Sequence, residues 1–75
     1  MSYSKEAVAR NLKVERVKHG WSQEELAEAA GMNVGNVARY EAGINTPGLD
    51  TALKLAQALG VSIDALVGWR PPEAA

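Results

Sequence analysis

QEELAEAAGMNVGNVARYEA, residues 23–42, is the stretch that decides the fold. Its apolar residues recur at three- and four-residue spacings on both sides of Gly31, which is the period of an amphipathic helix. Two helices that cross steeply need a small residue at their contact, a glycine in the turn and a branched apolar residue on the second helix. Ala27, Gly31 and Val37 occupy these positions. The stretch therefore predicts two helices joined by a short turn, the second projecting outward.

Polar residues and glycines predict where these two helices begin and end. Ser22 and Glu25 form a capping-box pattern, in which each side chain bonds the other residue's backbone N–H. Asn33 is placed to cap the second helix, and a glycine follows its last turn. The predicted helices cover about residues 23–30 and 33–42.

The rest of the chain has the same helical periodicity and almost no period-2 alternation. Three further helices are expected, over about residues 4–19, 49–59 and 63–67. The residues expected to face inward are Val8, Leu12 and Val17 in the first of these, and Leu49, Leu53, Ala56 and Leu59 in the second. The predicted fold class is all-α: a compact five-helix bundle forming one domain over residues 1–70, with a flexible tail at residues 71–75.

Length and composition exclude several classes of protein. A chain of 75 residues holds one small domain, and the lack of cysteine excludes disulfides and thiolate metal clusters. The longest stretch without a charge, residues 29–38, is far shorter than the roughly 18 apolar residues of a membrane span. Residues 1–20 lack the apolar core of a signal peptide. We therefore expect a soluble, cytoplasmic protein.

Residues that carry enzyme chemistry are scarce. The sequence has one histidine, no Gly-rich phosphate loop and no carboxylate pair in an evident pocket. The histidine, His19, falls in the last turn of its predicted helix, where a cation suits the helix dipole. We therefore expect a protein that is not an enzyme and that takes no metal, cofactor or small-molecule ligand.

The charge distribution is uneven. The net charge of −1 gives no overall attraction to nucleic acid or acidic membranes. Residues 1–20 carry five basic and two acidic residues, whereas residues 21–50 carry one basic and five acidic residues. The basic charge is therefore concentrated at the first predicted helix.

Three separated runs resemble, in the same order, a known family. They are WSQEELAEAAG at residues 21–31, NVARYEAG at 36–43 and LKLAQALGVSIDALV at 53–67. The chain resembles, over about residues 12–67, the Cro/phage-repressor-like helix-turn-helix family of bacterial and phage regulators, also called the xenobiotic-response-element family. The resemblance implies a lambda-repressor-like domain of five helices that inserts its third helix into a major groove of double-stranded DNA, usually as a homodimer on a palindromic site.

The resemblance implies roles for polar residues of the second and third helices. Gln23 matches a family glutamine that bonds a phosphate, with Ser22 assisting. Asn33 and Asn36 match positions that touch phosphates or base edges, where an asparagine can form two bonds to adenine. Arg39 matches a base-facing position, from which it can reach guanine or a phosphate. The alternatives are an ordinary helix-start residue for Gln23 and pairing with a surface carboxylate for Arg39.

Two features depart from the family pattern. Val34 and Gly35 stand where the family often has polar base readers, although Val34 can pack on a thymine methyl. Gly35 costs about 1 kcal/mol relative to alanine inside a helix, and reflects either a close approach to DNA or chance variation. The turn after the third helix contains Asn45 and Thr46, which are expected to contact DNA. This turn lacks the basic residues that the family often has there. We expect modest affinity and a shallow salt dependence.

Two structural contacts complete the prediction. Arg16 and Glu41 match the family's buried ion pair between the first and third helices; the alternative is two unconnected surface charges. An apolar strip on and after the last helix is the expected dimer interface, the alternative being ordinary core. Its members are Ile63, Val67 and Trp69.

The function that fits best is sequence-specific binding of double-stranded DNA by a transcriptional regulator, most simply a repressor that binds a palindromic operator as a dimer. The rival is a protein-interaction module that uses the same scaffold to bind a toxin or another regulator through its acidic surface, with weak or no DNA binding. The negative net charge and the residues Val34, Gly35 and Ile44 favour this rival.

Overall fold

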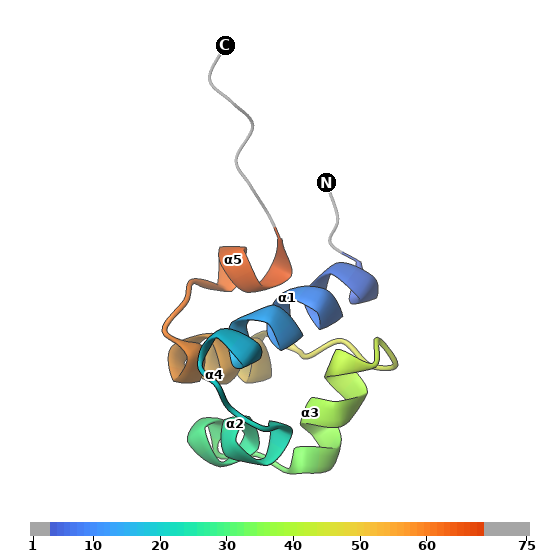
Figure 1. Ribbon diagram of the computed structural model, residues 1–75. Coiled ribbons are helices and arrows are strands. Elements are labelled where there is room, and N and C mark those ends of the chain that lie inside the picture. Colours follow the sequence, from blue (N-terminus) through green and yellow to red (C-terminus); the bar gives the residue numbers. More distant parts are fainter. Residues whose placement is uncertain (1–3, 69–75) are drawn as a thin grey trace.

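The computed structural model describes residues 4–68, and every regular element within that range is a helix (Figure 1). In chain order the helices are α1 (Lys5–Lys18), α2 (Gln23–Ala30), α3 (Val34–Glu41), α4 (Leu49–Leu59) and α5 (Ile63–Val67). The predicted all-α, five-helix fold is confirmed. Trp69 and the expected tail at residues 71–75 lie outside the described residues. No helix of the described range has the length and apolar character needed to cross a membrane.

The boundaries of α2 follow the predicted end signals. The Ser22 hydroxyl accepts from the Glu25 backbone N–H at 3.0 Å, and the Ser22 N–H donates to Glu25 Oε1 at 2.8 Å. This reciprocal pair is the predicted capping box, and it is confirmed. Gly31 ends the helix in the left-handed region at φ 69°, where a side chain is strained. The chain can therefore turn sharply from α2 into α3.

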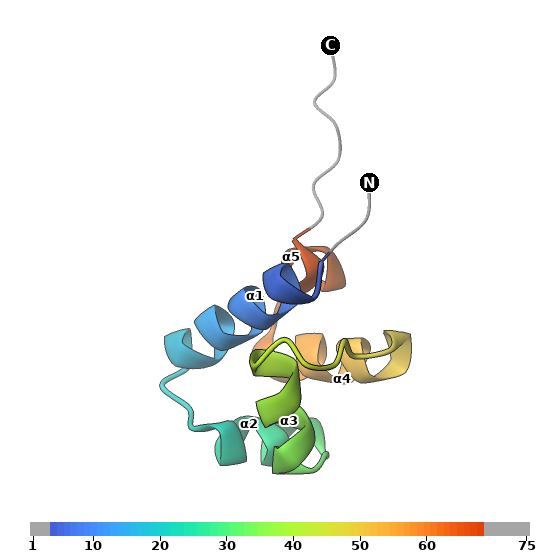
Figure 2. The same ribbon diagram turned by 90° about the vertical axis from the view of Figure 1, so that its right-hand side faces the viewer.

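The two helices α2 and α3 lie together at one end of the molecule. In Figures 1 and 2 they occupy the lower end of both views, whereas α5 lies at the upper end, above α1. Helix α1 packs against α3 and α5, and α4 packs against α2 and α5. Helices α2 and α3 therefore lie at the end of the molecule away from α5.

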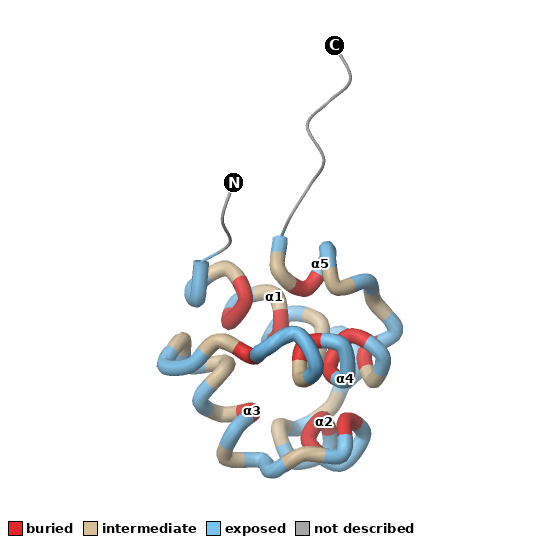
Figure 3. The backbone as a smooth tube through the Cα atoms, turned by 180° about the vertical axis from the view of Figure 1, so that it is seen from behind, coloured by how far each residue is buried: buried red, intermediate tan, exposed pale blue. Residues whose placement is uncertain are grey.

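One side chain from each helix is completely buried in a shared core. These five residues, each 0% exposed, are Leu12, Leu26, Val37, Leu55 and Leu66. Buried positions accordingly appear on all five helices in Figure 3. Burying one such side chain contributes about 1.5–3 kcal/mol. The core therefore joins α3 to every other helix of the described chain.

The predicted inward position of Val17 on α1 is wrong, because the side chain is 58% exposed. Val8 and Leu12 are buried as expected. Near the end of α1 the inward position belongs to Arg16, which contacts Glu41 on α3. Because consecutive helical residues point about 100° apart, an inward Arg16 turns Val17 toward solvent.

Two of the four residues of α4 that were predicted to face inward are exposed. Leu49 is 74% exposed and Leu53 is 45% exposed, whereas Ala56 and Leu59 are buried. The buried residues of α4 are Ala52, Leu55, Ala56 and Leu59. The two alanines on this stripe let α4 pack directly on α2 and α5, which rotates the helix so that Leu53 points away from the core.

Candidate nucleic-acid interface

The candidate interface is the outward side of α3. Asn33, Asn36 and Arg39 follow one another at three-residue intervals and are exposed, so they lie along one side of the helix. Val37, on the inward side of the helix, is fully buried. Val34 is 38% exposed beside these polar residues, and Gly35 is half-buried. The structure therefore brings the expected base-contacting residues of α3 together on one accessible surface.

Asn33 begins α3 as its N-cap. Its Oδ1 accepts from the Gly35 backbone N–H at 2.6 Å. A Cβ on residue 35 would lie 2.9 Å from that oxygen and 3.7 Å from Arg39 Nη1. Such a Cβ would displace the capping oxygen. The cap of α3 therefore explains why residue 35 is a glycine, an explanation that differs from both sequence-based alternatives.

Arg39 is bonded to the residue one turn before it. Its Nη1 donates to Asn36 Oδ1 at 3.1 Å. Within the described chain, the side chain of Arg39 therefore bonds an amide oxygen and forms no ion pair with a carboxylate. The sequence analysis missed this bond, although polar residues three apart on a helix are the signal for it.

Arg16 on α1 and Glu41, the last residue of α3, form an ion pair that holds the C-terminal end of α3 against α1. Arg16 Nε lies 2.7 Å from Glu41 Oε2, Nη2 lies 3.0 Å from Oε1, and Nη1 donates to the Trp21 carbonyl at 2.7 Å. The two side chains are 13% and 4% exposed. Donation to Glu41 raises the pKa of the Arg16 guanidinium above its ordinary value; burial opposes this, and the charge of Glu41 adds to it.

Gln23 joins the same cluster from the start of α2. Its Nε2 donates to Glu41 Oε1 at 3.1 Å, and the residue is half-buried. The N–H groups of the first helical turn lie outside the helix's own hydrogen-bond ladder and face outward along the axis. Ser22 is exposed, and its oxygen is engaged in the capping box. No local sequence signal indicates the bond from Gln23 to Glu41, because the two residues are 18 positions apart.

The segment after α3 is accessible but uncharged. Asn45 is exposed, Thr46 is half-buried and Ile44 is 64% exposed. The Arg39 carbonyl accepts from the Ile44 N–H at 3.0 Å, which holds the segment against the end of α3. The expected loop residues therefore adjoin the α3 surface.

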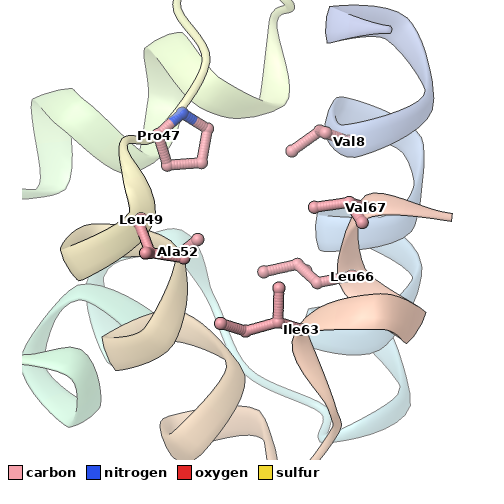
Figure 4. Close-up of a pocket in the computed structure, with 7 residues that line it drawn as sticks. All are labelled: Val8, Pro47, Leu49, Ala52, Ile63, Leu66 and Val67. Atoms are coloured by element: carbon pink, nitrogen blue, oxygen red, sulfur yellow. The ribbon is translucent and has the colours of Figure 1, made fainter. Parts of the chain in front are cut away.

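The expected dimer residues Ile63 and Val67 lie elsewhere, at an apolar cavity of about 180 Å³ between α5, α1 and the start of α4 (Figure 4). The cavity is lined by Val8, Pro47, Leu49, Ala52, Ile63, Leu66 and Val67. Ile63 also packs against the core. Ile63 and Val67 are thus partly buried, and the dimer role expected of them stays a prediction.

The His19 side chain contacts neighbouring parts of the fold. Its Nε2 lies 2.7 Å from the Leu59 carbonyl oxygen, and its ring stacks on Trp21 with centroids 4.3 Å apart. Among residues 4–68 no group of three or more His, Asp or Glu side chains is arranged to hold a metal ion. His19 thus connects the end of α1 to the end of α4.

Comparison with known proteins places these features in context. The family model HTH_3, described as helix-turn-helix, matches residues 12–66. The chain is 37% identical to the HTH-type transcriptional regulator ImmR of Bacillus subtilis over 83% of this chain and 49% of the relative. It is 31% identical to the antitoxin HipB of Escherichia coli over 81% of this chain and 65% of the relative. The chain thus spans about half to two thirds of the length of these curated relatives.

Two solved structures share the fold. A hypothetical transcription factor, NHTF, from Neisseria superposes with a TM-score of 0.81 at 36% identity, over 84% of this chain and 72% of that one. The restriction-modification controller protein C.AhdI from Aeromonas hydrophila superposes with a TM-score of 0.79 at 32% identity, over 83% and 94%. In both comparisons the overlap includes most of the helical domain.

Proposed function

The chain belongs to the HTH_3 helix-turn-helix family, whose members similar to it are transcriptional regulators, and from this premise we propose that it represses transcription by binding a palindromic operator as a homodimer. The observation that carries the proposal is the exposed polar side of α3, backed by the buried Val37. A major groove about 12 Å wide accepts a helix presented in this way. The side chains of α3 would then meet base edges.

In this proposal the base contacts come from residues 33–39. Asn36 and Arg39 face the base edges, and Val34 packs against a thymine methyl group. Gly35 leaves space beside them for the capping oxygen of Asn33. Asn33 contacts a phosphate with the amide nitrogen that its capping role leaves free.

The phosphate contacts come from the two segments that flank α3. Ser22 and Gln23 begin α2, whose N-terminal end carries a partial positive charge and favours an anion. Asn45 and Thr46 supply neutral donors on the other side. Because the net charge is −1 and the segment after α3 lacks basic residues, few phosphates are neutralised. Affinity is therefore modest and depends only shallowly on salt.

The proposed dimer uses the cavity at α5. Two copies must place their recognition helices about 34 Å apart to enter successive major grooves on one face of DNA. Ile63 and Val67 lie at the end of the molecule opposite α2 and α3 (Figure 1). A two-fold contact there, with Trp69 contributing, leaves both α3 surfaces free.

The rival function is a protein-interaction module. The observations that favour it are the exposed acidic residues Glu24, Glu25 and Glu28 on α2 and the similarity to an antitoxin. In that case the acidic surface of α2 would contact the partner, and α3 would bind DNA weakly or not at all.

Mobility shift on random genomic fragments over a series of salt concentrations separates the two functions. A regulator shifts the fragments at low salt and releases them as salt rises, whereas an interaction module gives no shift. Selection of bound sites from random duplexes then tests the operator. Inverted half-sites with centres about 10 base pairs apart support a dimer, and single unpaired half-sites contradict it.

A further inference from the structure

We propose that the intramolecular hydrogen bonds of Asn33 and Asn36 leave α3 presenting mainly hydrogen-bond donors to the major groove, and that the protein therefore selects guanine over adenine at the base pairs facing Asn36 and Arg39. This inference rests on the proposed function and specifies the DNA that it recognises. It follows from where the two asparagine oxygens of residues 33–39 point.

The first oxygen belongs to Asn33 and is used by the helix cap. Asn33 Oδ1 accepts from the Gly35 N–H at 2.6 Å. A backbone N–H only donates, so the atom that meets it must be the amide oxygen and not the nitrogen. The cap leaves the amide nitrogen of Asn33 free, with its two donor hydrogens.

The second oxygen belongs to Asn36 and is used by Arg39. Asn36 Oδ1 accepts from Arg39 Nη1 at 3.1 Å. A guanidinium has five donors and no acceptor, so the assignment of this oxygen is also fixed by its partner. The remaining side chains between these residues are Val34, Gly35, Val37 and Ala38, which have no polar side-chain atoms.

The bond from Arg39 changes which base Asn36 can recognise. Asparagine reads adenine by presenting Oδ1 and Nδ2 together to N6 and N7. Here Oδ1 already accepts from Arg39 Nη1, so the N6 amino group of adenine would have to use the second lone pair of the oxygen, next to a positively charged donor. The bond to Arg39 therefore competes with the adenine contact that the family resemblance suggests.

Guanine has the complementary pattern. Its major-groove edge carries two acceptors, N7 and O6, whereas adenine and cytosine each present an amino donor. The free amide hydrogens of Asn36 and the remaining guanidinium hydrogens of Arg39 both match such an edge. A good bidentate contact discriminates between bases by about 5- to 150-fold in affinity.

Gly35 is the positioning residue of this arrangement. A Cβ there would lie 2.9 Å from the capping oxygen of Asn33 and 3.7 Å from Arg39 Nη1. The first distance is too short for a Cβ, so the missing side chain lets Asn33 Oδ1 keep its bond to the Gly35 N–H, whereas the second distance is an ordinary van der Waals contact. The glycine thereby holds the Asn33 oxygen in the cap without contacting a base itself.

The test is site selection from random duplexes with the full chain and two variants, Arg39→Ala and Arg10→Ala. Wild type should enrich guanine at the position facing Asn36 and Arg39, and adenine there should lower affinity by about 5- to 150-fold. Arg39→Ala frees Asn36 Oδ1, so adenine should now bind at least as tightly as guanine. Arg10 is an exposed arginine of α1, and its loss removes the same charge without altering base preference.

The outcomes separate this inference from the proposed function. Salt-sensitive binding in which wild type prefers adenine at that position overturns the inference alone. So does an Arg39→Ala protein that binds every sequence more weakly at an unchanged ratio of guanine to adenine. Absence of any shift at low salt overturns both. Equal helical circular dichroism for the three proteins ensures that a lost preference does not come from unfolding.

Discussion

Arg16 on α1 and Glu41 at the end of α3 are joined by two hydrogen bonds, from Nε to Oε2 at 2.7 Å and from Nη2 to Oε1 at 3.0 Å. Gln23, the first residue of α2, donates to the same carboxylate at 3.1 Å. One carboxylate thus connects three helices. The orientation of α3, and with it the direction in which its polar side points, depends on this carboxylate.

Glu41→Ala is expected to destabilise the fold strongly. The substitution leaves the Arg16 guanidinium largely buried with the Trp21 carbonyl as its remaining partner. Breaking one side of a buried pair costs about 3–5 kcal/mol. Urea unfolding followed by circular dichroism measures the loss. The matched control is Glu15→Ala, which removes an ion pair to the exposed Lys18 and should cost at most about 1 kcal/mol. Equal effects of the two substitutions would contradict the buried role of Glu41.

The contribution of this pair should not vary between about pH 7 and 10. The pKa of Arg16 is raised in the folded protein by donation to Glu41. A raised pKa means that the stabilisation is fully present below the pKa of the unfolded chain and is lost only as pH rises through the higher folded value. Arginine titrates far above this range. The difference in urea midpoint between wild type and Glu41→Gln should therefore stay constant, and a steady drift with pH would disprove it.

Gln23→Ala should weaken DNA binding without changing which sequence is preferred. A phosphate contact carries no base information, so affinities for a selected site and for a scrambled site should fall by the same factor. Fluorescence anisotropy with the two duplexes gives both values. Gln57→Ala, an exposed glutamine on α4, is the control and should have no effect. A changed ratio between the two duplexes would mean that Gln23 acts through the orientation of α3.

Leu49→Asp should weaken the proposed dimer. Leu49 is 74% exposed and lines the cavity with Ile63 and Val67, so a charge there disturbs an apolar contact without entering the core. Sedimentation over a range of protein concentrations should show a dissociation constant raised at least about tenfold, since placing a charge in an apolar contact costs more than about 1.4 kcal/mol. Ile44→Asp is the matched control, because Ile44 is 64% exposed and does not line the cavity. An unchanged mass for Leu49→Asp would place the two-fold contact elsewhere.

The helix boundaries could be predicted because their signals are local. The Ser22 hydroxyl and the Glu25 carboxylate bond backbone groups within three residues of themselves. Gly31 adopts a left-handed conformation that few other residues tolerate. Such interactions need no tertiary structure. The sequence therefore contains enough information to position the helix ends.

The rotation of each helix about its axis was harder to predict. Helix α4 has leucines at positions 49, 53, 55 and 59, which spread over an arc of about 160° at 100° per residue, wider than the buried stripe of the helix. Which of them is buried depends on how closely the neighbouring helices approach, and that distance is set by Ala52 and Ala56. Periodicity alone does not contain this tertiary information.

The sequence indicated which residues of the candidate site to expect on one surface, but not the hydrogen bonds that these residues form with one another. The family pattern identified Asn36 and Arg39 as members of one surface, and the structure exposes both. Their mutual hydrogen bond depends on the rotamers that the two side chains adopt, which the sequence does not specify. The Gln23 bond depends on Glu41, whose position Arg16 sets from a different helix.

Between Asn33 and Arg39, a single residue of α3, Val37, is buried in the core. The attachments of α3 beyond it, through Tyr40 and Glu41, lie at its C-terminal end. Substitutions at Val34, Asn36 and Arg39 should therefore change the folding energy only slightly. If α3 recognises DNA as proposed, a protein with this fold can acquire a new operator by substitutions on the outer side of α3 without losing its folded structure.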